Sequence, residues 1–173
     1  MKFVKSAWLL AAVPVLVAPL LAQGDGAPPR EFRANLTGPG EVPLSLTAAQ
    51  GQLQLTINDD DSSVHFVLTY EGLATHVRFS HIHVGKPTDL GGVTVFFCGG
   101  GGQPDCPEGS GTAEGDFTAD DVIGLTAQEL AAHDLPRLLA AIRSGQTYAN
   151  LHTDDSPGGE IRGQIRPIRK GGK

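Results

Sequence analysis

The sequence predicts an all-β chain that folds as an antiparallel Greek-key sandwich or barrel with a short helical insert. Short segments with apolar residues at every second position recur along the chain, which is typical of half-buried strands. Turn residues separate these segments at near-regular intervals, and the 173 residues include 23 glycines and 12 prolines. Only residues 126–142 break this rhythm. Many short strands with little helix are the pattern of a β-sandwich or β-barrel.

The first 22 residues have the composition of a secretory signal peptide. Lys2 and Lys5 supply the positive start, residues 7–17 the apolar centre, and Ala22 a small residue at the cleavage position. The apolar run is interrupted by prolines and is too short for a convincing membrane span. We therefore expect cleavage near Ala22 and a secreted or periplasmic product without a membrane span.

The rest of the chain is predicted to hold one domain. Residues 23–29 are rich in glycine and proline and are expected to form a linker, residues 30–168 the domain, and residues 169–173 a basic tail. This length is enough for a single hydrophobic core.

The strands of this domain follow from the pattern in chain order. Residues 31–36, 51–57 and 64–70 alternate apolar and polar side chains. The turn at residues 58–63 predicts that the last two of these strands form an antiparallel hairpin. Further strands are expected at residues 74–84, 93–97, 112–117, 147–152 and 160–165.

The helical insert is expected in two parts. Thr126 can cap a first helical segment that begins at Gln128. Residues 135–142 are expected to form a second short helix with Pro136 in its first turn, and Gly145 is a typical helix stop.

Two cysteines, Cys98 and Cys106, enclose a glycine-rich loop. In an oxidising compartment, cysteines this close in sequence favour a disulfide that closes the loop. A pair of thiolate metal ligands is the alternative, and the lack of Cys-x-x-Cys spacing counts against it. We expect a Cys98–Cys106 disulfide.

Three histidines form the candidate functional site. His81 and His83 share one face of the predicted strand at 74–84, because side chains on a strand alternate faces. His152 ends another predicted strand, and residues 153–155 are candidates to orient its ring. The sequence therefore predicts one copper or zinc ion held by His81, His83 and His152. The alternative is that these rings only hydrogen-bond to neighbouring loops.

The other charged and titratable groups are interpreted structurally. Glu160 and Arg162 leave the core-facing side of the last strand, where an ion pair with Glu41 or Asp155 is the expected role. The remaining histidines are expected at the surface: His65, His76 and His133.

Taken in order, the motifs of this chain resemble the CHRD domain, which is named from chordin and also occurs in many exported bacterial proteins. The matching segments are Phe32 to Gly38 with Glu41-Val42-Pro43, Ala49 to Gly51, Tyr70 to Leu73, His81 to Gly85, Gly91 to Val93, Leu139 to Gly145, Tyr148 to Thr153 and Pro157 to Ile165. The resemblance covers nearly all of residues 30–168. It implies an exported binding module without a defined biochemical activity.

A second resemblance is to copper/zinc superoxide dismutases, which are Greek-key barrels with a His-x-His pair on a strand. It implies a fold of the immunoglobulin-like or copper/zinc superoxide dismutase-like kind. The sequence lacks the histidine-rich loop of the dismutase zinc site, so dismutase chemistry does not follow.

Functions of different classes fit these observations. The first is an exported binding module that holds one metal ion without turnover and meets an unknown extracytoplasmic protein or small ligand. The second is a metal-dependent enzyme with redox or hydrolytic chemistry at the same histidines, and a third is a metal-free adhesive domain. No glutamate adjoins either histidine motif, which favours the binding module.

A net charge of −6 without a basic face argues against nucleic acid as a partner.

Overall fold

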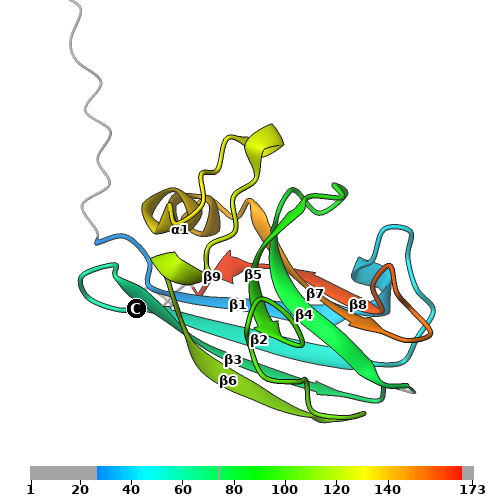
Figure 1. The fold of residues 1–173 in the computed structure, drawn as a ribbon. Helices are drawn as coiled ribbons and strands as arrows, with labels where there is room; N and C mark the ends of the chain where they lie inside the picture. Colours follow the sequence, from blue (N-terminus) through cyan, green and yellow to red (C-terminus); the bar gives the residue numbers. More distant parts are fainter. Residues whose placement is uncertain (1–26, 74, 169–173) are drawn as a thin grey trace, which may run out of the picture.

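The computed structural model describes residues 27–73 and 75–168, which form an antiparallel, nearly closed barrel (Figure 1). The strands are β1 (Glu31–Thr37), β2 (Gln50–Ile57), β3 (Ser63–Glu71), β4 (Val77–Val84), β5 (Gly92–Cys98), β6 (Gly111–Thr118), β7 (Thr147–Thr153), β8 (Ile161–Gln164) and β9 (Arg166–Pro167). The helix of the described residues is α1 (Leu135–Arg143), with 3-10 turns at Gly38–Gly40, Ala119–Asp121 and Thr126–Gln128. The all-β prediction with a short helical insert is confirmed. The expected signal peptide and basic tail lie outside the described residues.

The strands hydrogen-bond in the order β5-β4-β7-β8-β1-β2-β3-β6, and β9 pairs with β1. The predicted hairpin is present as β2 and β3, in register from Gln50 opposite Glu71 to Ile57 opposite Val64. β6 follows β5 in the chain but pairs with β3, and β7 returns to β4, so the chain crosses between distant parts of the sheet. The two edge strands β5 and β6 lie against each other, and the sheet therefore curls into a barrel.

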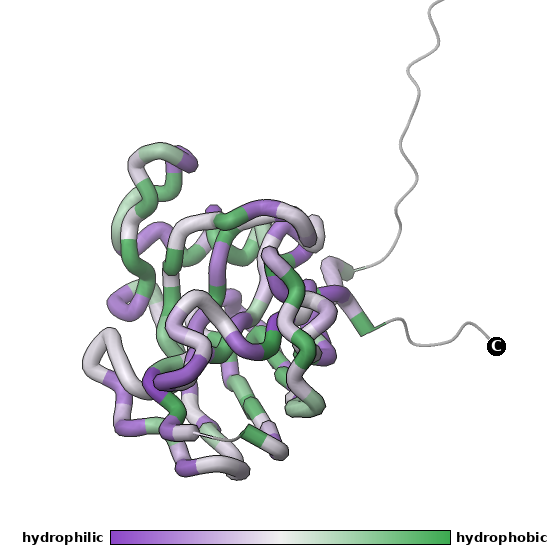
Figure 2. The backbone as a smooth tube through the Cα atoms, turned by 90° about the vertical axis from the view of Figure 1, so that its right-hand side faces the viewer, coloured by the Kyte–Doolittle hydropathy of each residue, from purple (hydrophilic) through white to green (hydrophobic). Residues whose placement is uncertain are grey.

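Alternating side chains of the strands fill the barrel. On β1, Phe32, Ala34 and Leu36 are buried while Arg33 and Asn35 are exposed. The same alternation appears along the strands of Figure 2 as short steps between hydrophobic and hydrophilic colour. Across the interior, the ring centroids of Phe66 on β3 and Phe97 on β5 lie 4.9 Å apart. Packing of this kind joins strands that are far apart in the hydrogen-bonded order.

The second part of the helical insert forms as predicted. The Asp134 side chain caps α1 by accepting a hydrogen bond from the Arg137 backbone N–H at 3.1 Å. Gly145 follows the helix with a φ of 69°, a left-handed conformation that glycine adopts without strain. The apolar face of α1 packs into the core through Leu135, Leu138, Leu139 and Ile142.

The first part of the insert does not form the expected helix. Only one 3-10 turn, Thr126–Gln128, is present, and Glu129 ends it with a φ of 56°. A β-bridge between Leu125 and Leu130 closes the segment instead. The burial of Leu130 in the core outweighs the local helical pattern. Within the described residues, no helix has both the length and the apolar character needed to cross a membrane.

Cys98 and Cys106 form a disulfide in the structure, in agreement with the prediction. The bond closes a loop that starts at the end of edge strand β5. Gly99 begins this loop with a φ of 74°, and its N–H donates to the carbonyl oxygen of Pro104 at 2.8 Å. The loop also touches β5, because an added Cβ at Gly100 would lie 2.6 Å from the Phe96 ring. The disulfide therefore fixes a loop that packs on an outward-facing aromatic side chain.

We predict that Cys98→Ser/Cys106→Ser lowers the free energy of unfolding by about 2–3 kcal/mol, because the short loop is no longer closed in the unfolded chain. Urea denaturation under oxidising conditions measures the difference. A reductant should destabilise the wild type by a similar amount and leave the double variant unchanged. Equal midpoints for the oxidised wild type and the variant would contradict the prediction.

Candidate metal centre

The pairing of β4 with β7 brings the three histidines together. His81 lies opposite Asn150, and His152 lies opposite Phe79 two residues away. Facing residues of an antiparallel pair share one side of the sheet, so His152 is the diagonal neighbour of His81. The ring centroid of His81 is 4.6 Å from that of His83 and 4.8 Å from that of His152. One ring nitrogen from each histidine lies within 4.8 Å of the others.

These rings lie on the outer face of the barrel. The residues that alternate with them, Ile82 and Leu151, are fully buried in the core on the opposite face. The histidines are nonetheless covered, with exposed fractions of 2% for His81, 9% for His83 and 8% for His152. A covered polar cluster on the outside of a barrel is unusual, because a strand face without a function is normally left to water.

Aromatic rings provide much of this cover. Phe96 of β5 meets the His81 ring edge-on at 5.1 Å, and Phe79 stacks on His81 at 5.4 Å. Tyr148 stacks on His83 at 4.5 Å, with only 8° between the ring planes. The disulfide loop packs on Phe96, so it supports this cover from outside. The rings limit the access of water and fix the orientation of the imidazoles.

Backbone carbonyls hold two of the imidazoles in one tautomer. Nδ1 of His83 is 2.8 Å from the carbonyl oxygen of Gly91, and Nδ1 of His152 is 3.0 Å from that of Pro157. Since a carbonyl only accepts, each Nδ1 must carry the proton and donate it. Each Nε2 therefore presents a lone pair. Residues 153–155, which we expected to orient His152, do not; the Pro157 carbonyl has that role.

The lone pairs of the cluster have no partner within the described residues. The buried nitrogens without a hydrogen bond are Nδ1 of His81, Nε2 of His83 and Nε2 of His152. Buried polar atoms are nearly always satisfied in folded proteins, so three unsatisfied nitrogens at one place mark a group that could hold a metal ion. Carbonyl-held imidazoles with free nitrogens are the usual arrangement of histidine metal ligands.

The imidazoles are neutral at physiological pH. Burial, together with the neighbouring His83 and His152, lowers the pKa of His81 to about 2. Burial also lowers the pKa of His83 to about 4, against the opposing effects of the Gly91 carbonyl and the Asn150 side chain. The pKa of His152 is lowered by burial as well. Neutral imidazole is the form that binds a metal ion, so no proton must leave before an ion binds at neutral pH.

A buried polar network that the sequence analysis did not identify adjoins the histidines. The Nδ2 group of Asn150 donates to Oε1 of Glu41 at 2.6 Å. Burial raises the pKa of Glu41 to about 7, although Arg162, the Val42 N–H and Asn150 act in the opposite direction. The signal for Asn150 was in the sequence, because it alternates with His152 on the same predicted strand. Glu41 comes from the distant segment between β1 and β2, and no local pattern indicated its place.

The expected ion pairs of the last strand are not the contacts that form. The guanidinium of Arg162 lies over the Tyr148 ring, 3.3 Å from its centroid, and its Nη2 donates to the carbonyl oxygens of Lys86 and Asp89. Glu160 accepts hydrogen bonds from the hydroxyls of Thr47 and Thr153 at 2.8 and 2.6 Å. Within the described residues, no ion pair joins either side chain to an opposite charge. Both side chains are buried, where stacking and directional hydrogen bonds replace a solvated ion pair.

The other histidines lie at the surface, as predicted. Nδ1 of His65 is 3.1 Å from an Asp116 carboxylate oxygen, and Nδ1 of His76 is 2.5 Å from one of Glu108. The ring of His133 is also exposed. None of them belongs to the three-histidine cluster.

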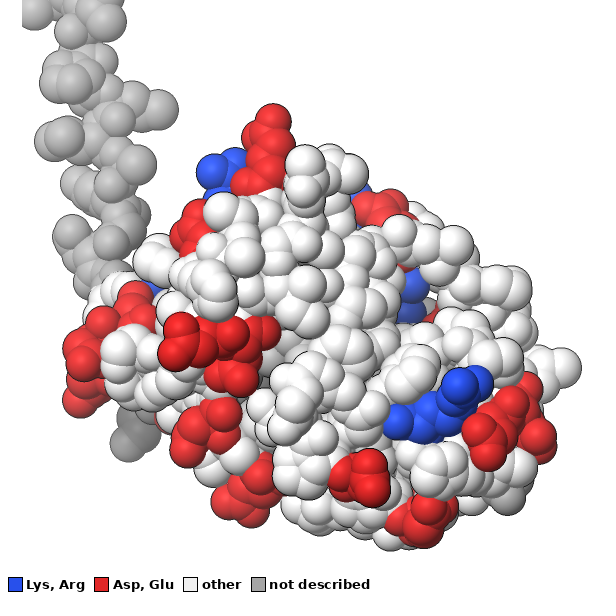
Figure 3. All heavy atoms as spheres, in the orientation of Figure 1, with Lys and Arg blue, Asp and Glu red and all other residues white. Residues whose placement is uncertain are grey.

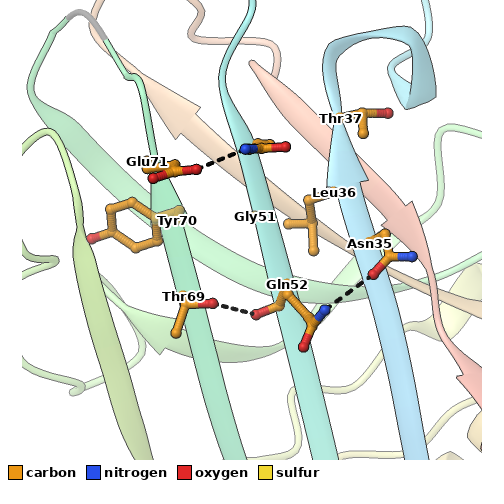
Figure 4. A pocket seen from close by; sticks show the side chains of 9 residues that line it. Asn35, Leu36, Thr37, Gly51, Gln52, Thr69, Tyr70 and Glu71 are labelled. Carbon is orange, nitrogen blue, oxygen red and sulfur yellow. Dashed lines mark hydrogen bonds between the residues drawn. The ribbon is translucent and has the colours of Figure 1, made fainter.

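Outside this cluster, the outer face of β1, β2 and β3 carries a shallow hollow of about 430 Å³ (Figure 4). Apart from Glu71, neutral side chains line it, and its polar groups bond to one another, as in the 3.4 Å hydrogen bond from Gln52 to Asn35. The Gln50 amide donates to the Glu71 carboxylate at 2.7 Å. These exposed side chains satisfy one another, so the hollow lacks the unpartnered groups that mark the histidine cluster.

The surface charge is mainly acidic. Figure 3 shows a broad uncharged area at the centre of the face on which β4 lies, with acidic side chains to its left and below it and few basic ones. The net charge of the chain is −6. A field of this sign raises the local concentration of cations around the molecule.

We predict that Glu41→Gln stabilises the protein at alkaline pH. The pKa of Glu41 is about 7 in the folded protein against 4.5 in the unfolded chain, so the folded state binds more protons between these values. The wild type therefore loses stability as the pH rises from 4.5 through 7. The variant should be more stable by up to about 3 kcal/mol at pH 8 and about equal at pH 4.

Urea unfolding of both proteins between pH 4 and 8 measures this difference. Glu71→Gln is a matched control on the exposed end of β3 and should leave the pH profile unchanged. A difference between the wild type and Glu41→Gln that does not change with pH would show that the Glu41 carboxyl is not held in its neutral form.

Comparison with known proteins agrees with the motifs found in the sequence. A family model of the CHRD domain matches residues 32–165. No curated protein and no solved structure matches the chain. The family match contains strands β2 to β8 and all of β1 except Glu31, together with the histidine cluster and the disulfide. The chain belongs to the CHRD domain family.

Proposed function

We propose that this protein is an exported CHRD-domain binding module that holds one copper or zinc ion through His81, His83 and His152, without catalytic turnover. The observation that carries the proposal is a cluster of three histidines in which each ring has a buried nitrogen without a partner and one ligand nitrogen of each lies within 4.8 Å of the others. A single cation satisfies all three lone pairs at once.

The chemistry of the donors supports copper or zinc. Neutral imidazole nitrogens suit both ions, and three such ligands leave one coordination position open. Two ligands of a tetrahedral zinc ion are roughly 3.3 Å apart when each bond is about 2.0 Å. The 4.8 Å limit of the cluster is wider than this separation, so the ligand nitrogens move closer together when an ion binds.

Two features support an extracytoplasmic setting. The Cys98–Cys106 disulfide is the stable form of a cysteine pair in an oxidising compartment. The first 22 residues have the composition of a secretory signal peptide, and they lie outside the described residues. In such a compartment the module meets an extracytoplasmic protein or a small ligand.

The arrangement of carboxylates favours binding over catalysis. Metal-dependent hydrolysis needs a general acid or base close to the bound substrate. Glu41 is the titrating carboxyl of the network, but among the described residues it is linked to the cluster only through the Asn150 side chain. Within the described residues, no carboxylate is hydrogen-bonded to His81, His83 or His152.

We predict that the protein takes up one equivalent of copper or zinc and that His81→Ala/His83→Ala takes up none. Elemental analysis of protein purified from its native compartment and calorimetric titration with each metal measure the stoichiometry. At a free metal concentration 100 times the Kd, binding should stabilise the wild type by about 2.7 kcal/mol.

The matched control is His65→Ala/His76→Ala, which removes two histidines from the surface and should retain full uptake. His152→Ala removes a ligand from the other strand and should weaken binding strongly. Equal uptake by the wild type and His81→Ala/His83→Ala, both shown to be folded by circular dichroism, would reject the assignment.

A further inference from the structure

Asn150 is a further unsatisfied group of the covered face, beside the three histidines. It lies on β7 directly opposite His81 and is only 3% exposed. Its Oδ1 atom is buried and has no hydrogen-bond partner within the described residues. The Asn150 side chain also acts on the pKa of His83, which places the amide beside that ring.

The orientation of the Asn150 amide is fixed by the hydrogen bond of its Nδ2 atom. Nδ2 donates to Glu41 Oε1 at 2.6 Å, and an amide nitrogen can only donate, so this end of the amide faces the carboxyl group. The loop before β8 closes over this pair at Gly159, where an added Cβ would lie 2.5 Å from Nδ2 and 2.7 Å from Oε1. The amide therefore cannot turn without breaking a short, covered hydrogen bond. Oδ1 is left as the atom available to the cluster.

The cluster then contains more acceptors than a metal ion satisfies. Nε2 of His83 and Nε2 of His152 present lone pairs, and with Nδ1 of His81 they can satisfy one ion. Oδ1 of Asn150 is an acceptor as well, and no donor in the described chain reaches it. A hydrogen-bond donor that binds together with the metal ion would satisfy Oδ1 of Asn150. Three nitrogen ligands leave a position for such a group.

We infer that Asn150 is a positioning residue for the ligand at the open coordination position, and that this ligand is protic, such as water or another molecule with an O–H or N–H group. The inference rests on the proposed metal site. Oδ1 accepts the ligand's hydrogen bond, and Glu41 holds the amide in place. An anion without a proton is disfavoured there, because its charge faces the partial negative charge of Oδ1.

The test uses the purified protein loaded with Co²⁺, whose visible absorption reports the coordination of a histidine site. Azide is the probe of an anion without a proton. The variants are Asn150→Leu, which keeps the volume and removes the acceptor, and Asn150→Ala, which removes the acceptor without adding a branched side chain. Asn35→Leu is the matched control, because Asn35 is an exposed asparagine on β1.

We predict that both Asn150 variants bind one equivalent of Co²⁺ with an affinity within about threefold of the wild type and bind azide about tenfold more tightly. The Asn35→Leu protein should match the wild type in both measurements. Circular dichroism identifies which of the two Asn150 variants is folded, and either one is sufficient for the comparison.

Two results overturn the inference while the metal site stands. Equal azide affinity in the wild type and a folded Asn150 variant means that Oδ1 does not face the open position. Loss of Co²⁺ binding from a folded variant means that Asn150 is itself a metal ligand. Failure of the wild type to bind Co²⁺, copper or zinc is the separate result that overturns the proposed function and this inference together.

Discussion

The antiparallel register between β4 and β7 is the constraint on which the site depends. It places His81 opposite Asn150 and His152 opposite Phe79, so the three imidazoles and the amide share one face. A shift of this register by one residue would move His152 and Asn150 to the core side of β7, because strand faces alternate. Ile82 and Leu151, buried behind the site, oppose such a shift through the packing of the barrel. The hydrophobic core therefore fixes the geometry of a polar site that lies outside it.

The same register makes the site costly for the protein without a bound group. Buried nitrogens and an amide oxygen without partners each cost about 1–3 kcal/mol relative to hydrated groups. The lowered pKa values of His81 and His83 have the same origin in burial, because the surroundings of these rings penalise a positive charge. The carbonyls of Gly91 and Pro157 fix the rings of His83 and His152 by accepting hydrogen bonds from their Nδ1 atoms. Preorganisation of this kind lowers the entropic cost of binding an ion.

Loops add to the cover that the aromatic side chains of the strands provide. The carbonyls that hold His83 and His152 come from the segments after β4 and after β7. Glu41 reaches Asn150 from the segment between β1 and β2. The disulfide loop supports the aromatic cover through Phe96. On the outer face of β1 to β3, by contrast, exposed polar side chains bond to one another. The outer surface of the barrel therefore has an exposed part over β1 to β3 and a covered part over β4 and β7. The unsatisfied imidazole and amide groups lie on the covered part.

Local patterns in the sequence were enough to predict the β-strands, the helix α1, the disulfide pair and the shared face of His81 and His83. Each of these follows from local periodicity or short spacing, which act within a few residues of the chain. Only the tertiary structure decided that His152 joins the pair, that Asn150 and Glu41 extend the cluster, and that Arg162 stacks on Tyr148 instead of forming an ion pair. It also decided that the segment at Thr126 ends after one 3-10 turn, because Leu130 is drawn into the core. These outcomes depend on which strands pair and on what covers them, and the energies that select the pairing come from residues far apart in the chain.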